Sequence, residues 1–110
     1  MNSARRKRLE AAGWRVGTAE EFLGLSREEA AVVQLKLALG ASLKRYREQR
    51  GLTQIGLAKK IRSSQSRVAK LEAAAPGVSL DLLFRALFAT GVTLKALARE
   101  LARLSRANAA

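Results

Sequence analysis

Apolar residues recur at helical spacing in the segment from about residue 27 to Arg50. One stripe of large side chains returns every three or four residues, and Val33 and Leu37 form a second stripe beside it. The first stripe contains Val32, Leu35, Leu39, Leu43 and Tyr46. Two stripes predict a long helix buried on more than one side, against either the segment with Trp14 and Phe22 or a second chain.

Serine and threonine residues mark the expected helix starts. Thr18 and Ser26 each stand three residues before a glutamate, the capping-box spacing in which side chains bond the free amides of a first turn. Thr53 and Ser79 stand before shorter periodic segments as N-caps, Ser64 begins another such segment, and Gly51 and Gly91 follow the ends of others. The expected helices cover about 18–24, 27–50, 53–61, 64–73, 79–89 and 93–105.

The apolar positions of the shorter helices predict their core-facing sides. These positions are Ile55, Ala58 and Ile61, then Val68 and Leu71, then Leu80, Leu83, Phe84, Leu87 and Phe88. In the last helix Leu94, Leu97, Leu101 and Leu104 are spaced 3, 4 and 3 residues apart. Such a seam forms within one chain or, less often, in a coiled coil.

Composition excludes several classes of function. The 110 residues contain 48% hydrophobic and 5% aromatic residues, enough for one compact domain of packed helices. Cysteine and histidine are absent, which removes thiolate and imidazole metal ligands and the commonest general base. No cofactor is expected. The basic N-terminus leads into no apolar signal region, and no apolar run is long enough to span a membrane, so we expect a cytoplasmic protein.

The sequence favours neither a catalytic nor a membrane-binding function. A Ser/Lys dyad from Ser63 or Ser64 with Lys59 or Lys60 lacks an oxyanion or base signature, so no enzyme is predicted. The glutamates at 20, 21, 28 and 29 lie in first helical turns, where the helix dipole favours anions, rather than in an acid/base or metal pattern. A basic amphipathic membrane binder would need exposed cationic and apolar faces together.

The positive charge is concentrated in one region. The net charge is +12, and residues 44–72 alone carry +7, whereas residues 16–43 carry −2. A polyanion is the simplest partner for such a chain. The run Arg5-Arg6-Lys7-Arg8 is either an arm that follows DNA or a solubilising tail.

The same basic region contains two short helical patterns joined by a break at Arg62-Ser63, which is the pattern of a helix-turn-helix. Val68 and Leu71 define the buried side of the second helix. The opposite side carries Ser66, Ala69 and Lys70, with Gln65 and Arg67 at its edges. Amide, hydroxyl and cationic side chains without acidic ones suit the reading of base edges in a major groove.

Residues 52–72, LTQIGLAKKIRSSQSRVAKLE, resemble the Cro/CI-type helix-turn-helix of the XRE family. Eight positions match: Leu52, Thr53, Gln54, Leu57, Ala58, Ser64, Val68 and Glu72. The resemblance implies an all-α, five-helix lambda-repressor-like domain that binds duplex DNA. It also implies that Glu72 pairs with Arg47 as a structural brace, and that the loop 75–79 touches the opposite backbone strand. We expect the DNA-binding residues to be Thr53, Gln54, Arg62, Ser64, Gln65, Ser66, Arg67 and Lys70.

Two positions depart from the family pattern. Arg62 stands where the family usually has a turn glycine, so the turn either keeps a left-handed residue at a cost of about 1 kcal/mol or takes another shape. Arg62 then contacts a phosphate or stays in solvent. Gly56 lies inside the first helix, where alanine would be more favourable.

The segment from Trp14 to Ser26 resembles the N-terminal extension of HigA-like antitoxins. This resemblance implies an antitoxin of a HigBA-like module that represses its own promoter and neutralises a RelE-like toxin. A stand-alone or phage-type XRE regulator is the alternative. The expected organisation is a basic arm (1–13), a helical extension (14–29) and a DNA-binding domain (30–105, with the helix-turn-helix at 53–73), acting as a homodimer in the nucleoid.

Overall fold

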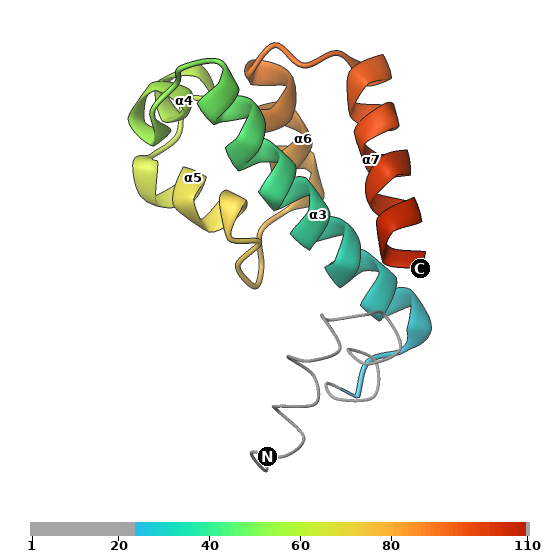
Figure 1. Cartoon of the computed structure of the whole chain (residues 1–110). Coiled ribbons are helices and arrows are strands. Elements are labelled where there is room, and N and C mark those ends of the chain that lie inside the picture. The colour runs from blue at the N-terminus through green and yellow to red at the C-terminus, as the bar shows by residue number, and fades with distance from the viewer. Residues whose placement is uncertain (1–23, 110) are drawn as a thin grey trace, which may run out of the picture. The chain divides into compact units, whose positions relative to one another are not determined.

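The computed structural model describes residues 24–109, with side chains as far as Arg106. The chain divides after Leu35 into two units, residues 1–35 and 36–110. The described residues form helices without strands, as Figure 1 shows: α3 (Arg27–Gln49), α4 (Gln54–Lys60), α5 (Gln65–Glu72), α6 (Leu80–Ala89) and α7 (Leu94–Ala109). The expected all-α, five-helix fold is confirmed. The expected basic arm and the helix at 18–24 lie outside the described residues.

Each of the five helices begins after a serine or threonine. The hydroxyl of that residue accepts a hydrogen bond from the amide three residues later, at 2.9–3.1 Å, which satisfies one free donor of the first turn. At the start of α3 the Ser26 amide also donates to Glu29, completing the expected capping box. Hydrogen bonds from the Ser26 backbone and side chain lower the pKa of the Glu29 carboxyl.

Helices α3, α4 and α5 end in the same C-terminal motif. The second residue past the cap donates its amide to a carbonyl five residues back, and the first donates to the carbonyl three residues back. In this motif the first residue past the cap must have a positive φ. Gly51 takes this place after α3, with φ 69°, whereas Arg62 (53°) and Ala74 (51°) take it after α4 and α5. A residue with a Cβ costs roughly 1–2 kcal/mol in this conformation.

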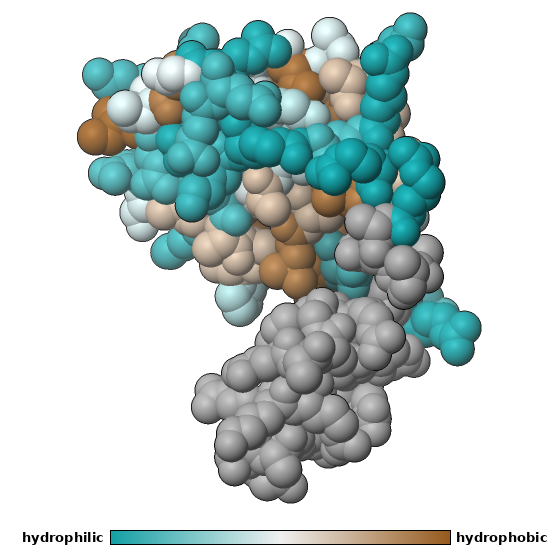
Figure 2. Space-filling model, viewed as in Figure 1, coloured by the Kyte–Doolittle hydropathy of each residue, from teal (hydrophilic) through white to brown (hydrophobic). Residues whose placement is uncertain are grey.

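The core of the unit from residue 36 onward is mainly aliphatic. Leu39 and Leu43 of α3 are fully buried together with leucines from each of the other helices, namely Leu57, Leu71, Leu83, Leu87 and Leu97. Each of α4, α5, α6 and α7 therefore buries one side against this core. In Figure 2 hydrophilic residues cover most of the visible surface of this unit, interrupted by small hydrophobic patches.

Helix α3 approaches α5 closely at Gly40. A Cβ atom at this position would lie 2.8 Å from the carbonyl oxygens of both Leu71 and Glu72. These are backbone atoms at the end of α5, so they cannot rotate away as a side chain could. The glycine therefore sets the distance at which α5 lies against α3, which is the packing reason for a residue that lowers intrinsic helix stability.

Several expected core positions are wrong. Ile55 is 52% exposed, because α4 turns its Leu57, Ala58 and Ile61 inward and Ile55 lies about 120° around the helix from Ile61. Phe88 is 43% exposed and stacks on Phe84 at a centroid distance of 6.5 Å.

In two further helices the expected stripes are buried along only part of their length. Leu94, the first residue of α7, is 71% exposed. Of the other residues of this seam, Leu97 is buried and Leu101 and Leu104 are half-buried. Val32 and Leu37 of α3 are each 42% exposed.

Candidate nucleic-acid interface

Helices α4 and α5 and the turn between them form one compact pair. The turn from Ile61 to Ser64 is closed by the Ser63 amide, which donates to the Ala58 carbonyl at 2.8 Å. Val68 and Leu71 attach α5 to the core with no exposed surface. The other side of α5 is exposed, and it consists of Gln65, Ser66, Arg67, Ala69 and Lys70. Every exposed side chain of this face except alanine can donate a hydrogen bond, and none is acidic.

Behind this face, Glu72 at the end of α5 forms a buried ion pair with Arg47 of α3. The Arg47 Nε lies 2.5 Å and its Nη2 3.2 Å from the two carboxylate oxygens, and the side chains are only 11% and 5% exposed. The Arg47 Nη1 donates to the Leu52 carbonyl at 2.9 Å. The hydrogen bond to Glu72 raises the pKa of the Arg47 guanidinium, against the effect of partial burial. The expected brace between Arg47 and Glu72 is confirmed.

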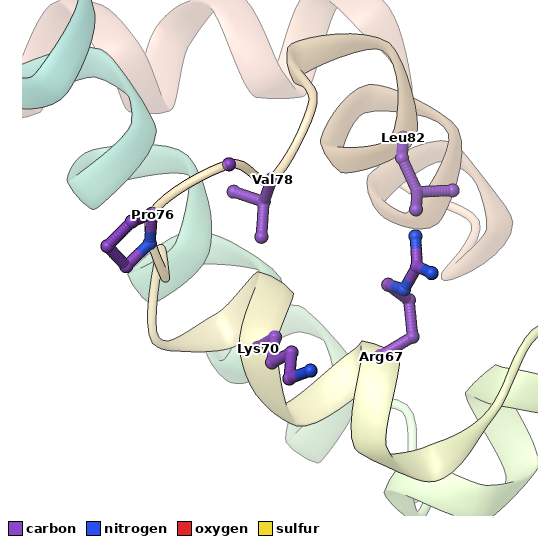
Figure 3. Close-up of a pocket in the computed structure, with 6 residues that line it drawn as sticks. Arg67, Lys70, Pro76, Val78 and Leu82 are labelled. Carbon is purple, nitrogen blue, oxygen red and sulfur yellow. The ribbon is translucent and has the colours of Figure 1, made fainter.

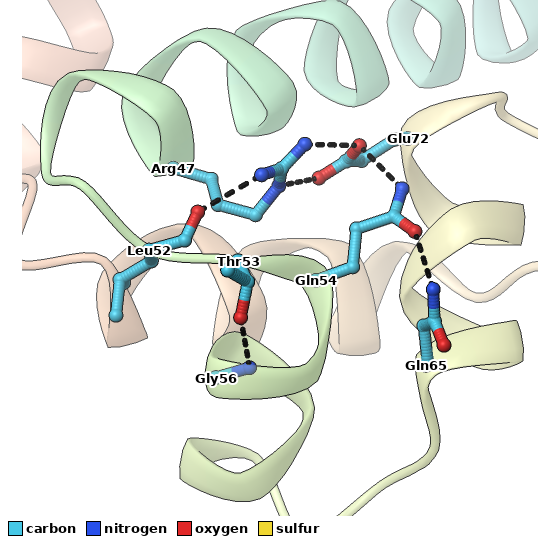
Figure 4. Close-up of polar contacts among 7 residues, drawn as sticks. All are labelled: Arg47, Leu52, Thr53, Gln54, Gly56, Gln65 and Glu72. Carbon is cyan, nitrogen blue, oxygen red and sulfur yellow. Dashed lines mark hydrogen bonds and ion pairs between the residues drawn. The ribbon is translucent and has the colours of Figure 1, made fainter.

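A chain of hydrogen bonds connects this ion pair to the exposed face (Figure 4). The Nε2 of Gln54, the first residue of α4, donates to the Glu72 Oε1 at 3.1 Å, and the Gln54 Oε1 accepts from the Nε2 of Gln65 at 3.4 Å. Because the ion-paired carboxylate can only accept, Gln54 must present its amide nitrogen to Glu72 and its oxygen to Gln65. These two hydrogen bonds therefore fix the orientation of the side-chain amides of both Gln54 and Gln65.

A groove of about 240 Å³ runs along the other edge of α5. Figure 3 shows Arg67 and Lys70 on the α5 side and Pro76, Val78 and Leu82 across from them. Gly77 completes the lining. The groove thus joins two cationic side chains to an apolar wall and to the loop 75–79, a combination suited to an anionic group attached to an apolar ring or sugar.

The eight sequence-predicted site residues all lie in α4, α5 or the caps and turn that join them. Thr53 and Ser64 are N-caps, and each hydroxyl accepts an amide bond of its own helix. Gln54 is half-buried and internally bonded, while Gln65, Ser66, Arg67 and Lys70 are exposed on α5. Arg62 is exposed in the turn, which keeps the left-handed shape.

The bond between Gln54 and Gln65 was not predicted from the sequence. These residues are eleven positions apart in two different helices, and no periodicity within one helix reports such a pair.

The sequence pattern of the helix-turn-helix family matches residues 43–97, half of the 110 residues. The chain belongs to this helix-turn-helix family. The match begins inside α3, contains the whole of α4, α5 and α6, and ends at the buried Leu97 of α7. Comparison with curated proteins and with solved structures returned no significant match.

Membership of the XRE-type helix-turn-helix family makes the chain a DNA-binding transcriptional regulator, because the family is a regulatory and not a catalytic one. Within the described residues no three histidine, cysteine or acidic side chains are grouped as metal ligands. None of the described helices is long and apolar enough to cross a membrane.

Proposed function

We propose that the protein is a sequence-specific repressor that reads duplex DNA with the exposed face of α5. The observation that carries this proposal is the chain of bonds from Glu72 through Gln54 to Gln65, which orients a base-reading amide at the N-terminal end of α5. A recognition helix contacts base edges with its N-terminal residues, so Gln65 and Ser66 occupy the reading positions. Repression then follows from occupation of a promoter.

The orientation of Gln65 favours adenine. Its Nε2 already uses one hydrogen to donate to Gln54, which leaves the second N–H and the Oε1 for the DNA. Adenine presents an N7 acceptor and an N6 donor side by side in the major groove, and a glutamine amide bonds both at once. The opposite amide orientation would break the bond to Gln54. The contact therefore prefers one base without any rearrangement of the free protein.

The remaining site residues suit the DNA backbone. Arg67 and Lys70 line the groove beside the loop 75–79, where a phosphate of the opposite strand would meet two cations. The free amides of the first turn of α4, which Thr53 caps, offer donors to a phosphate, and the second Nε2 hydrogen of Gln54 can join them. Ser64 contributes as the N-cap that orients the first turn of α5.

A single α5 of eight residues reaches only a few base pairs, and for this reason we propose that two copies bind together. Two recognition helices would then enter successive major grooves about 34 Å apart on one side of the duplex. The operator expected for such a homodimer has two half-sites related by two-fold symmetry.

Two kinds of regulator fit this interface, and they differ in a protein partner. A HigA-like antitoxin would also bind a RelE-like toxin, and support for this reading comes from the resemblance of residues 14–26, most of which lie outside the described residues. A stand-alone or phage-type regulator would have no toxin partner. Co-purification with the product of any adjacent RelE-like reading frame distinguishes them: a stable complex supports the antitoxin, and its absence supports the second reading.

Selection of bound fragments from random duplex DNA tests the proposed function itself. We expect enrichment of one motif with two related half-sites about 10 base pairs apart, each containing an adenine that the Gln65→Ala variant no longer prefers. Recovery of unenriched sequences by the wild-type protein would contradict a sequence-specific repressor. The Ser105→Ala variant, changed at an exposed residue of α7, is the matched control and should enrich the wild-type motif.

A further inference from the structure

Two helices of the helix-turn-helix end at residues that strain the backbone. Arg62 and Ala74 occupy the same position of the same C-terminal motif and have nearly the same φ, 53° and 51°. Gly51 occupies the same position after α3. Glycine adopts this conformation without the steric penalty of a Cβ. A residue other than glycine at this position therefore costs stability, and the question is whether its side chain contributes something in return.

The surroundings of Arg62 and Ala74 differ. Ala74 is half-buried and carries no functional group. Arg62 is exposed and lies two residues after Lys60, at the basic end of α4 that also holds Lys59. Among the described residues, the ion pairs with carboxylates are formed by Arg45, Arg47 and Arg103. Lys59, Lys60 and Arg62 form none of them. The guanidinium of Arg62 is therefore available to an anion from outside this part of the chain.

The position of Arg62 relative to α5 indicates which anion. Arg62 precedes Gln65 by three residues, in the turn that leads into the N-terminal end of the recognition helix. Since that end of the helix enters the major groove, the turn before it lies beside the phosphates at the groove edge. We propose that Arg62 is a phosphate-binding residue whose contact with DNA is retained at the expense of fold stability. This inference rests on the proposed reading of DNA by α5.

A purely structural role for Arg62 is the competing explanation. A cation at the C-terminal end of α4 interacts favourably with the helix dipole, and this would stabilise the fold without DNA. The two roles differ in the effect that loss of the Arg62 charge has on stability and on DNA binding. Replacement by glycine relieves the strain in both cases, but only a phosphate contact makes the variant weaker on DNA.

Three variants separate strain from charge. Ala74→Gly relieves strain alone, Arg62→Gln removes charge alone and Arg62→Gly does both. Each is compared with the wild type in thermal unfolding and in fluorescence anisotropy, with a fluorescein-labelled duplex of mixed sequence about three helical turns long as the probe. Anisotropy titrations at several salt concentrations give the number of phosphate contacts from the slope of log K against log[salt].

The phosphate role predicts a crossed result. Both glycine variants should unfold about 2–6 °C higher than the wild type, and Arg62→Gln should not. Both Arg62 variants should bind the duplex about three- to tenfold more weakly at ~0.1 M salt, with a slope reduced by about 0.9 for each protein chain bound, and Ala74→Gly should match the wild type.

Two results would overturn the inference. One is equal affinity and equal slope for Arg62→Gly, Arg62→Gln and the wild type. The other is a lower unfolding temperature for Arg62→Gln than for the wild type, with unchanged binding by both Arg62 variants, which assigns Arg62 to the helix dipole. In both cases the wild type still binds the duplex, so the proposed function stands. If the wild type itself shows no salt-dependent binding, the proposed function fails with this inference.

Discussion

Helix α3 forms ion pairs with a carboxylate of α5 and with a carboxylate of α7, and the arginine partners of these two carboxylates differ in burial. Glu72 of α5 pairs with Arg47, and both side chains are nearly buried, at 5% and 11% exposure. Glu100 of α7 pairs with Arg45 and Arg103, which are 41% and 54% exposed. Tyr46 adds a hydrogen bond of 3.4 Å to Glu100, and the Arg45 guanidinium lies 5.4 Å from the Tyr46 ring centroid.

The difference lies in what remains when each carboxylate is removed. Without Glu72 a buried guanidinium loses its counter-charge and Gln54 loses its acceptor. Without Glu100 the two arginines turn to water. A buried carboxylate therefore contributes to stability and, through Gln54, to the orientation of Gln65, whereas a carboxylate with exposed partners contributes little to either.

The largest effect is expected from a substitution that breaks the buried ion pair between Arg47 and Glu72. Glu72→Ala should lower the free energy of unfolding by about 3–5 kcal/mol, because it leaves an uncompensated charge in the core. Urea-induced unfolding at pH 7 measures the loss. Glu100→Ala is the matched control in the same experiment. A smaller loss for Glu72→Ala than for Glu100→Ala would show that burial does not distinguish the two sites.

The next effect concerns the packing that brings Glu72 to Arg47. Gly40→Ala places a Cβ 2.8 Å from two backbone carbonyl oxygens of α5, and we expect a loss of about 1–3 kcal/mol by urea unfolding. Gly56→Ala is the control, since its Cβ would meet only side-chain atoms, the nearest at 3.3 Å. Gly56→Ala should stay within about 1 kcal/mol of the wild type. Equal losses for both variants would contradict a close α3–α5 contact.

A third prediction tests whether the buried pair acts on base reading. Gln54→Ala removes the link between Glu72 and Gln65, so the preference for adenine at the Gln65 position should fall by about 0.5–1.5 kcal/mol. Competition between the selected operator and its adenine-substituted form measures this preference. Gln49→Ala, at an exposed residue at the end of α3, is the control. An unchanged adenine preference in Gln54→Ala would show that the ion pair of Arg47 and Glu72 does not influence base recognition by Gln65.

The smallest effect is expected at the second carboxylate. Glu100→Ala should cost about 1 kcal/mol or less, because its arginine partners are half exposed, and the cost should shrink as salt is added. The affinity for the operator should not change. A loss of operator preference in Glu100→Ala would mean that α7 also controls the reading face.

The amino-acid sequence predicts the local features of the fold well, since they depend on neighbouring residues. The cap at Ser26 with Glu29 and the caps at Thr53 and Ser79 are as expected. Burial was less predictable where a spacing of exactly three residues drifts around the helix. Ile55 and Ile61 belong to one such series and end up on different sides of α4.

The residues of the candidate site were predictable from the sequence, but most of the contacts between them were not. The pairing of Arg47 with Glu72 followed from the family resemblance, because the motif specifies the glutamate. The bonds of Gln54 depend on how two helices pack, and the approach of α5 to α3 depends on the absence of a side chain at Gly40. Neither is visible in hydrophobic periodicity. The left-handed turn at Arg62 likewise depends on hydrogen bonds of the folded backbone.

The most direct test of the central claim is a base-by-base affinity profile. Every base pair of the selected operator is substituted in turn, and the affinity of each duplex is measured for the wild type and for Gln65→Ala. We predict that Gln65→Ala loses about 1–3 kcal/mol of discrimination at one adenine in each half-site and keeps the wild-type profile elsewhere. An identical profile for both proteins would contradict the assignment of α5 as the reading helix.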